Sequence, residues 1–445
     1  MSHFRICCIA VLLLLSGLVA VGQPSRFKIT YSHNNAAEWA KSVLFLSDSS
    51  LMVNSMFNTP TERGILLINV NQNGTVVSTK THSRPNRIYS GSWAGSLLSI
   101  DSNFYVGGEY HIPNLNDPSN NFAFPSLVKF DKNGDTIWAK HYDFDTSAYY
   151  QASSCIKTSD GGILLCGAVA AYENYPGKYD YYVIKTDTSG NLLWQKRYGF
   201  DFRNEHSSSI AEFSDGRLLI SGVILNPSIT TAAPWVIITN DTGAVLWQRI
   251  YLNPSLQWGG AYAKPVGTSG FFLAGMTDTV VNLGDHPQTG YIAKADSNGD
   301  FIWHSIFSSK QRTSLWDFHE IDDGQLIFCG DQIDSITGKP TGYIAKVDKH
   351  GVLNWWRSYH ENLNAPAYLS CVRPAPDGGF VALGSAYPAT TPTSQDAWII
   401  KTDSLGCIVS NCHLSVDDIS KQPNKLSCFP NPADQLLNIR SDEKG

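Results

Sequence analysis

Charge and cysteine are both scarce in this sequence. Charged residues make up 16% of the 445 positions, and the net charge of −6 is spread along the chain without a basic block. Nucleic acid is therefore not expected as a partner. Nine cysteines are too few for a disulfide scaffold, and none stand in the C-x-x-C spacing typical of a zinc site. Hydrophobic residues reach 42%, which is enough for a packed core.

Long apolar runs are missing after the N-terminus, so no transmembrane segment is expected in the mature chain. The one such run, residues 6–21, follows a short polar stretch and is shorter than the ~20 residues of a spanning helix. Gly17, Ala20 and Gly22 are small residues placed where a signal peptidase cuts. The pattern predicts a signal peptide over residues 1–22. The expected location is secreted, extracellular or on the outer-membrane surface.

Removal of the signal peptide leaves seven cysteines, an odd number, so at least one thiol stays unpaired. Cys407 and Cys412 are close enough in sequence to form a disulfide in an oxidising compartment. Four others are interpreted as small buried hydrophobic residues: Cys155, Cys166, Cys329 and Cys371.

Helical periodicity is almost absent, and the chain instead repeats itself. The pattern Lys-x-Asp-x-x-Gly, with Trp four residues beyond the Gly, recurs along the sequence. Its turn glycine is found seven times, at intervals of 52 to 60 residues, as Gly74, Gly134, Gly190, Gly243, Gly299, Gly351 and Gly406. The turn aspartates of the clearest copies are Asp131, Asp187, Asp296, Asp348 and Asp403. Gly takes positive φ freely and Asp bonds the backbone two residues on, so each copy predicts a tight turn.

A second landmark supports the same count. Asp-Gly followed by a short apolar run that ends in Gly begins clearly at Asp160, Asp215, Asp323 and Asp377, with weaker versions at Asp48, Asp101 and Thr268. Each unit is interpreted as four short strands: one before Asp-Gly, one after it, one before Lys-x-Asp and one around the Trp. The fold class is therefore all-β. Residues 23–412 are predicted to form a seven-bladed β-propeller of four-stranded antiparallel blades, with the Trp and Tyr of strand four packed between blades.

The last unit lacks the Trp and Tyr that follow the turn glycine in most other units. The mature N-terminus carries an equivalent pair, because Phe27 and Tyr31 are spaced like Trp138 and Tyr142. We predict that residues 26–33 supply the outer strand of the last blade and close the ring.

The repeat ends at Cys412, and residues 413–427 are interpreted as a polar linker. The next segment contains Phe429, Pro430, Asn431, Pro432 and Ala433. It resembles the opening of the type A C-terminal sorting domain carried by cargo of the type IX secretion system of Bacteroidota, and residues 436–439 match the strand that follows it. The Asp-Gly-Gly repeats also look like those of such secreted cargo. Residues 428–445 would then be the start of a truncated sorting domain. The resemblance implies the type IX secretion machinery as a partner and translocation across the outer membrane; it implies no catalytic activity.

Several enzyme signatures do not fit. Pyrroloquinoline-quinone dehydrogenase repeats place Asp and Gly four residues apart, and sialidase Asp-boxes place an aromatic residue five after Asp, whereas the spacings here are three and seven. Asp131, Asn133 and Asp135 resemble the start of a calcium loop, but a hairpin turn explains them as well and is favoured. No cofactor is therefore predicted, with calcium as the alternative. Isolated histidines such as His141, His206 and His319 are interpreted as surface or turn residues.

Two functions remain open. The favoured hypothesis is a secreted or cell-surface binding or structural module, monomeric and non-catalytic, with an extracellular glycan, peptide or protein as its partner. Variation concentrated in loops such as residues 110–124 and 277–290 supports it, because recognition is commonly built on loops. The alternative is a propeller-fold hydrolase or lyase acting on extracellular glycans. Convergent carboxylates, or a His beside a carboxylate, in the central funnel would favour that alternative.

Overall fold

The computed structural model describes residues 25–92, 95–112, 122–142, 148–171, 178–200, 204–226, 231–252, 256–268, 270–279, 288–307, 312–388, 394–409, 412, 426–429 and 438–441. These residues form β-strands and one short 3-10 helix, η2 (Asp322–Gly324). The prediction of an all-β fold is confirmed. No helix in this part of the chain is both long enough and apolar enough to span a membrane.

Four consecutive stretches of the chain each form a four-stranded antiparallel sheet in simple sequence order. The first contains β11 (Ala148–Lys157), β12 (Ile163–Ala171), β13 (Tyr179–Thr186) and β14 (Leu192–Tyr198). The second contains β15 (Asn204–Glu212), β16 (Leu218–Asn226), β17 (Thr231–Thr239) and β18 (Val245–Ile250). The third contains β19 (Leu256–Val266), β20 (Gly270–Thr279), β21 (Gln288–Ala295) and β22 (Phe301–Phe307). The fourth contains β23 (Thr313–Glu320), β24 (Leu326–Ile333), β25 (Pro340–Val347) and β26 (Leu353–Tyr359). The assignment of strands to the two sequence landmarks is therefore confirmed in these units.

The first two repeat units share one nine-stranded sheet. One half contains β2 (Ala37–Phe45), β3 (Leu51–Asn58), β4 (Arg63–Val70) and β5 (Val76–His82). The other half contains β6 (Ile88–Gly91), β7 (Leu97–Ile100), β8 (Asn103–Ile112), β9 (Phe122–Phe130) and β10 (Thr136–His141). In the strand pairing, the halves are joined where Arg63 lies beside Ile88 in a parallel pair. The inner strand of the second half is split into β6 and β7, a feature that the repeat pattern does not predict.

The N-terminal strand pairs with the last sheet, as predicted. This sheet has the order β1 (Phe27–Tyr31), β29 (Asp396–Thr402), β28 (Phe380–Ala386) and β27 (Ala367–Pro374). Phe27 lies opposite Lys401 and Tyr31 lies opposite Ala397 in an antiparallel register. A shared hydrophobic core then joins this sheet to β2–β4, since Val53 and Ile68 lie in one cluster with Ile399. The chain termini of the repeat region are therefore held together by both hydrogen bonds and apolar burial.

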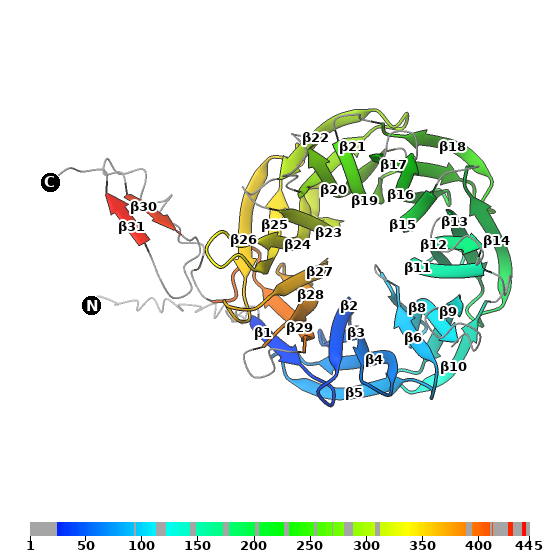
Figure 1. Ribbon diagram of the computed structural model, residues 1–445, viewed down its shortest axis with the longest axis horizontal. Coiled ribbons are helices and arrows are strands. Elements are labelled where there is room, and N and C mark those ends of the chain that lie inside the picture. The colour runs from blue at the N-terminus through cyan, green and yellow to red at the C-terminus, as the bar shows by residue number, and fades with distance from the viewer. Residues whose placement is uncertain are drawn as a thin grey trace, which may run out of the picture.

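The sheets follow one another around a common centre, with the first strand of each unit innermost and the fourth on the outer rim (Figure 1). Neighbouring sheets meet at the turn glycines. Tyr142 of one unit donates from Oη to the carbonyl oxygen of Gly190 in the next at 3.1 Å, and the Trp138 ring packs against the same glycine. The same bond joins Tyr198 to Gly243, Tyr251 to Gly299 and Tyr359 to Gly406. The predicted packing of the Trp and Tyr side chains between units is confirmed at these interfaces.

In six units, the first and innermost strand contains a β-bulge. In β23, for example, Leu315 pairs with Gly330 and Asp317 pairs with Cys329, so Trp316 is the extra residue. A side chain at Gly330 would overlap the carbonyl oxygen of Ser314, which explains why the apolar run of the second landmark ends in Gly. The extra residues of the six bulged inner strands are Lys41, Ser153, Ser208, Gly259, Trp316 and Ser370.

Beyond the repeats, β30 (Leu426–Phe429) and β31 (Asn438–Ser441) form a separate two-stranded sheet. β30 begins two residues before residue 428, the predicted start of the sorting segment. The predicted signal peptide, residues 1–22, and the predicted sorting residues Pro430, Asn431 and Pro432 lie outside the described residues.

Candidate functional site

A cavity of about 600 Å³ lies among the inner strands β2, β19, β23 and β27. Its lining is rich in aromatic side chains, contributed by Trp39, Tyr262, Trp316, Tyr368 and Tyr387. The polar side chains of the lining are Lys41, Arg312, Asp331, Ser370, Ser385 and Gln395. Large aromatic surfaces with a few placed polar groups are typical of ligand sites, which also fall in the range of roughly 300–1,000 Å³.

Three of these lining residues are the extra residues of β-bulges. Lys41 of β2, Trp316 of β23 and Ser370 of β27 occupy equivalent positions in their strands. A bulge bends the strand and re-aims the side chain of the inserted residue. The fold therefore offers an equivalent inner position in successive units, and the residue found there differs from one unit to the next.

Trp316 is held in place by a buried carboxyl group. Its Nε1 donates to Oδ1 of Asp331 at 2.5 Å, and Asp331 is only 3% exposed. Burial raises the pKa of Asp331 above its ordinary value, while the nearby Arg312 partly offsets this. The contact fixes the orientation of the indole ring at the wall of the cavity.

Lys41 lines the cavity and directs its ammonium group to β6, in the other half of the nine-stranded sheet. Nζ donates to the carbonyl oxygen of Gly91 at 3.0 Å and to Oγ of Ser90 at 3.4 Å. Burial lowers the pKa of Lys41 to about 8, and Glu109 acts in the opposite direction. The side chain therefore links β2 to β6 beside the cavity.

A second buried carboxyl group stands close to the cavity wall. Glu38 has no exposed surface and accepts a hydrogen bond from the backbone N–H of His33 at 2.7 Å. Burial raises the pKa of Glu38 to about 8, and Asp396 adds to the rise. The backbone N–H of Glu38 donates to the carbonyl oxygen of Gln395, a residue of the lining, at 2.8 Å.

An ionic network ties together the three inner strands β19, β23 and β27. Asp317 lies 3.1 Å from Nζ of Lys264 and also binds Nη1 of Arg373. It accepts further hydrogen bonds from the backbone N–H groups of Phe318 and Val372. Burial alone would raise the pKa of Asp317, but the two cations outweigh it and lower that pKa. Asp317 directly follows Trp316, so the network fixes the strand that carries this cavity residue.

The predicted turn residues lie in separate turns, one to a repeat unit, and the fold does not gather them into one site. In the first of these turns, Oδ1 of Asp131 accepts from the backbone N–H groups of Asn133 and Asp135 at 2.8 Å each. These bonds lower the pKa of Asp131, with the Asp135 bond contributing most. Asp187, Asp296, Asp348 and Asp403 make the equivalent bond to the residue after the turn glycine. Each carboxylate is thus used within its own turn.

Metal-ligating side chains do not cluster in the described part of the chain. No group of three or more His, Cys, Asp or Glu residues there could hold a metal ion. Cys407 and Cys412 form a disulfide. The predicted burial of Cys155, Cys166, Cys329 and Cys371 is confirmed, and burial raises the pKa of Cys166 to about 12.

The interpretation of the isolated histidines is wrong in two cases. His206 lies within β15, with its ring 4.4 Å from that of Tyr179, and burial lowers its pKa. His319 lies within β23 beside Asp317, and burial lowers its pKa too. Only His141, at the end of β10, is exposed. The positions of His206 and His319 were mispredicted because each histidine was considered alone, without its place in the first strand of its repeat unit.

A second histidine, His111, also lies beside a carboxylate. Nε2 of His111 is 2.8 Å from Oε2 of Glu109, both on β8. His111 lines a smaller cavity of about 170 Å³ with residues 59–63 and 86–88. Neither residue lines the aromatic cavity of about 600 Å³ among the inner strands, called the central cavity below. Sequence reasoning found neither this pair nor the aromatic cavity.

Comparison with known proteins gives only structural matches. No family model and no curated protein matches the sequence. The structural neighbours are β-propeller proteins. The polysaccharide lyase Uly1 has a TM-score of 0.48 and 8% identity, covering 82% of this chain and 90% of that one. The Neurospora crassa Pan2 WD40 domain has a TM-score of 0.47 and 11% identity, with coverage of 84% and 93%. The β-propeller domain of the Trilobed protease from Pyrococcus furiosus has a TM-score of 0.44 and 10% identity, with coverage of 83% and 95%. The activities in these names belong to those proteins.

Proposed function

We propose that residues 23–412 form a closed seven-bladed propeller that binds an extracellular glycan in its central cavity and does not cleave it. Five four-stranded sheets and the two halves of the nine-stranded sheet together supply seven units. The pairing of β1 with β29 supports closure of the ring between the last unit and the first. This architecture is consistent with the seven turn glycines of the sequence.

The observation that carries the binding proposal is the aromatic lining of the cavity. A sugar ring has apolar C–H faces that stack on aromatic rings and hydroxyl groups that both donate and accept hydrogen bonds. Trp316 and Tyr368 offer such rings, and Ser370, Ser385 and Gln395 offer polar partners. Because Asp331 and the Asp317 network fix the strand and ring of Trp316, the site needs little ordering on binding.

We also propose that the protein is exported. The support for this lies in the sequence, in the predicted signal peptide and the predicted sorting motif. The protein would use the type IX secretion machinery and act as a monomer that is secreted or attached to the outer-membrane surface. Deletion of residues 428–445 in the native host should cause the protein to accumulate in the periplasm; undiminished release would contradict this part of the proposal.

The test of binding is a glycan array probed with the mature chain, residues 23–445, with calcium and with a chelator. Trp316→Ala and Tyr368→Ala should each weaken the strongest signal at least tenfold, because each removes a stacking surface. Leu193→Ala, at an exposed position on β14, is the control and should leave it unchanged. Equal binding by the wild type and both cavity variants would contradict the proposal. Loss of binding with the chelator would show that calcium takes part.

One observation favours the alternative of a glycan hydrolase or lyase. Asp331 is a cavity carboxyl whose pKa is raised by burial, the property required of a general acid. Incubation of the bound glycan with the protein, followed by mass spectrometry, separates the two functions. Intact glycan agrees with a binding module. Cleavage that Asp331→Asn abolishes would establish the enzyme instead.

A further inference from the structure

A second site follows from one irregular interface on the outer rim. At five interfaces, called regular below, the residue two positions before the Tyr or His at or just beyond the end of strand four (His82, Tyr142, Tyr198, Tyr251 or Tyr359) is basic and lies against the turn of the next unit. These basic residues are Lys80, Lys140, Lys196, Arg249 and Arg357. Three of them bind a polar side chain that directly follows the next turn glycine: Lys80 to Asp135 at 2.6 Å, Lys140 to Asn191 at 3.0 Å and Arg249 to Asp300 at 2.7 Å.

The interface between β22 and β26 departs from this pattern. Ser305 stands where these five interfaces have Lys or Arg, and at the interface formed by β1 the equivalent residue is Ile29. Val352 follows the turn glycine, where two of the five interfaces likewise have residues without a polar acceptor, Ala244 and Cys407. The final aromatic residue of β22 is Phe307, which has no hydroxyl group. Oγ of Ser305 instead donates to the carbonyl oxygen of Gly351 at 2.8 Å. This interface therefore carries a short uncharged side chain where the regular interfaces carry a long basic one.

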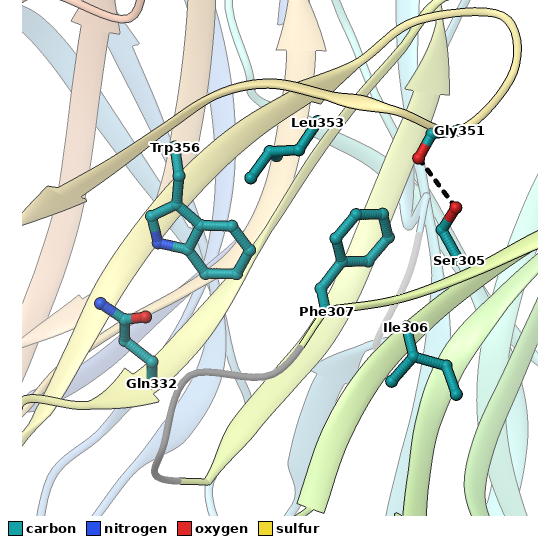
Figure 2. A pocket seen from close by; sticks show the side chains of 7 residues that line it. All are labelled: Ser305, Ile306, Phe307, Gln332, Gly351, Leu353 and Trp356. Atoms are coloured by element: carbon teal, nitrogen blue, oxygen red, sulfur yellow. Dashed lines mark hydrogen bonds between the residues drawn. The ribbon is translucent and has the colours of Figure 1, made fainter. Parts of the chain in front are cut away.

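A cavity of about 590 Å³ lies at this interface, lined by Ser305, Ile306, Phe307, Gln332, Gly351, Leu353 and Trp356. Figure 2 shows the rings of Trp356 and Phe307 projecting from the two sheets into the same space, with Gln332 beside the indole nitrogen. No lining residue is ionisable, in contrast to the central cavity.

The polar atoms of this cavity are suited to a hydroxylated ligand. One face of Trp356 stacks on Tyr343, with ring centroids 3.9 Å apart, which fixes the indole ring. The Nε1 of Trp356 is buried and has no hydrogen-bond partner. An unsatisfied buried donor is costly, so a ligand that supplies an acceptor is favoured. Gln332 donates from Nε2 to Ser358 at 2.8 Å and presents its amide oxygen as an acceptor.

We propose that this rim cavity binds an uncharged sugar ring, independently of the central cavity. The Phe307 and Trp356 rings supply stacking surfaces for its C–H face. Its hydroxyl groups accept from Nε1 of Trp356 and donate to the amide oxygen of Gln332 or the carbonyl oxygen of Gly351. A charged ligand is disfavoured because the lining offers no counter-charge. The site thus lies at a departure from the repeat, at a position that five other interfaces occupy with Lys or Arg.

The experiment uses the mature chain and four probes, the methyl glycosides of glucose, galactose, mannose and N-acetylglucosamine, measured by ligand-observed NMR and calorimetry. Ser305→Arg introduces the residue type of the regular interfaces into the cavity and should weaken binding of the active probe at least tenfold. Ser305→Ala is the matched control; it keeps the space and should change the affinity less than threefold. Thermal melts verify that each variant is folded.

Trp356→Phe is the second test, should Ser305→Arg fail to fold. It keeps a stacking ring but removes the unpartnered N–H, and should weaken binding at least fivefold. Trp316→Ala, in the central cavity, should leave this binding unchanged. Failure of all four probes to bind would overturn the rim proposal, as would binding that survives Ser305→Arg and Trp356→Phe. Binding lost only in Trp316→Ala would overturn it while supporting the central site.

Discussion

Four of the regular outer interfaces and the interface between β22 and β26 all bond the carbonyl oxygen of a turn glycine, but with different side chains and different packing around it. At a regular interface, Tyr198 binds the carbonyl oxygen of Gly243 at 2.8 Å and Lys196 covers that glycine. At the irregular one, Ser305 takes the carbonyl of Gly351 and a cavity lies beside it. The comparison teaches that the repeated residues hold neighbouring sheets together, whereas sites lie where the chain departs from the repeat.

The inner strands teach the same lesson in another way. Their bulges recur at an equivalent position, but the inserted residue is Lys41, Trp316 or Ser370 at the central cavity and Ser153 or Ser208 in other units. The rim is therefore chemically repetitive and the centre is varied. Substitutions at the regular rim interfaces should mainly change stability, and substitutions at the centre should mainly change binding.

The largest effect on stability is expected from removal of the N-terminal strand. Deletion of residues 25–33 exposes the edge of β29 and removes Phe27 from its contact with Gly74. The melting temperature should fall by on the order of 10 °C or more. Lys28→Ala, which keeps the strand, is the control. A deletion that melts like this control would mean that β1 does not close the structure.

Two effects oppose a side chain at the turn glycines: the positive φ of the backbone and the close approach of a neighbouring unit. Gly243 has φ of +79°, and a Cβ there would lie 2.8 Å from Lys196 and 2.9 Å from Tyr198. Gly216 has φ of +86° but open space around a Cβ. Gly243→Ala should destabilise by about 3 kcal/mol and Gly216→Ala by about 1 kcal/mol, measured by chemical denaturation. Equal losses would show that backbone conformation alone matters at Gly243.

Glu38, on the inner strand β2, should make the stability of the folded protein depend on pH. Its carboxyl group ionises near 4.5 in the unfolded chain, whereas burial raises its pKa to about 8 in the folded protein. Between these values the unfolded chain loses a proton that the folded protein keeps, so stability falls as pH rises. The loss by pH 7 is roughly 3 kcal/mol. Glu38→Gln should remove this trend and become the more stable protein above pH 6.

The control for the pH measurement is Glu62→Gln, at an exposed position. Melting temperatures of the three proteins are compared from pH 5 to pH 8. If Glu38→Gln and the wild type keep a constant difference over this range, the buried carboxyl group is not the source of the dependence.

The smallest effect is expected from single hydroxyl groups at the rim. Tyr198→Phe removes one buried hydrogen bond and should cost about 1 kcal/mol. Phe307→Tyr adds a hydroxyl group at the equivalent position but should bring almost no gain, because Ser305 already occupies the carbonyl of Gly351. A stabilisation of Phe307→Tyr equal to the loss in Tyr198→Phe would contradict this difference between the interfaces.

Much of the fold can be predicted from the sequence because its information is local. The turn at Asp131 depends on bonds within five residues, and the pairing of β1 follows from the spacing of Phe27 and Tyr31. The central cavity could not be predicted in this way. Its lining depends on strand register, which places Trp316 at a bulge and Asp331 beside it.

A usable signal for the bulge nevertheless exists. The inserted residue stands 14 positions before the last glycine of the second landmark, as in Trp316 and Gly330, or Ser370 and Gly384. The splitting of the inner strand into β6 and β7 has no such signal; the two strands pair with β8 in different registers, Gly91 opposite Gly108 and Leu97 opposite Val106. The Asp317 network also joins three units, and no local pattern relates its members.

The most direct test of the central claim is a crystal structure of the mature protein soaked with the oligosaccharide that gives the strongest array signal. The account predicts electron density for a sugar ring stacked on Trp316 and Tyr368 in the central cavity. Density found only outside that cavity, with its aromatic residues unoccupied, would contradict the claim.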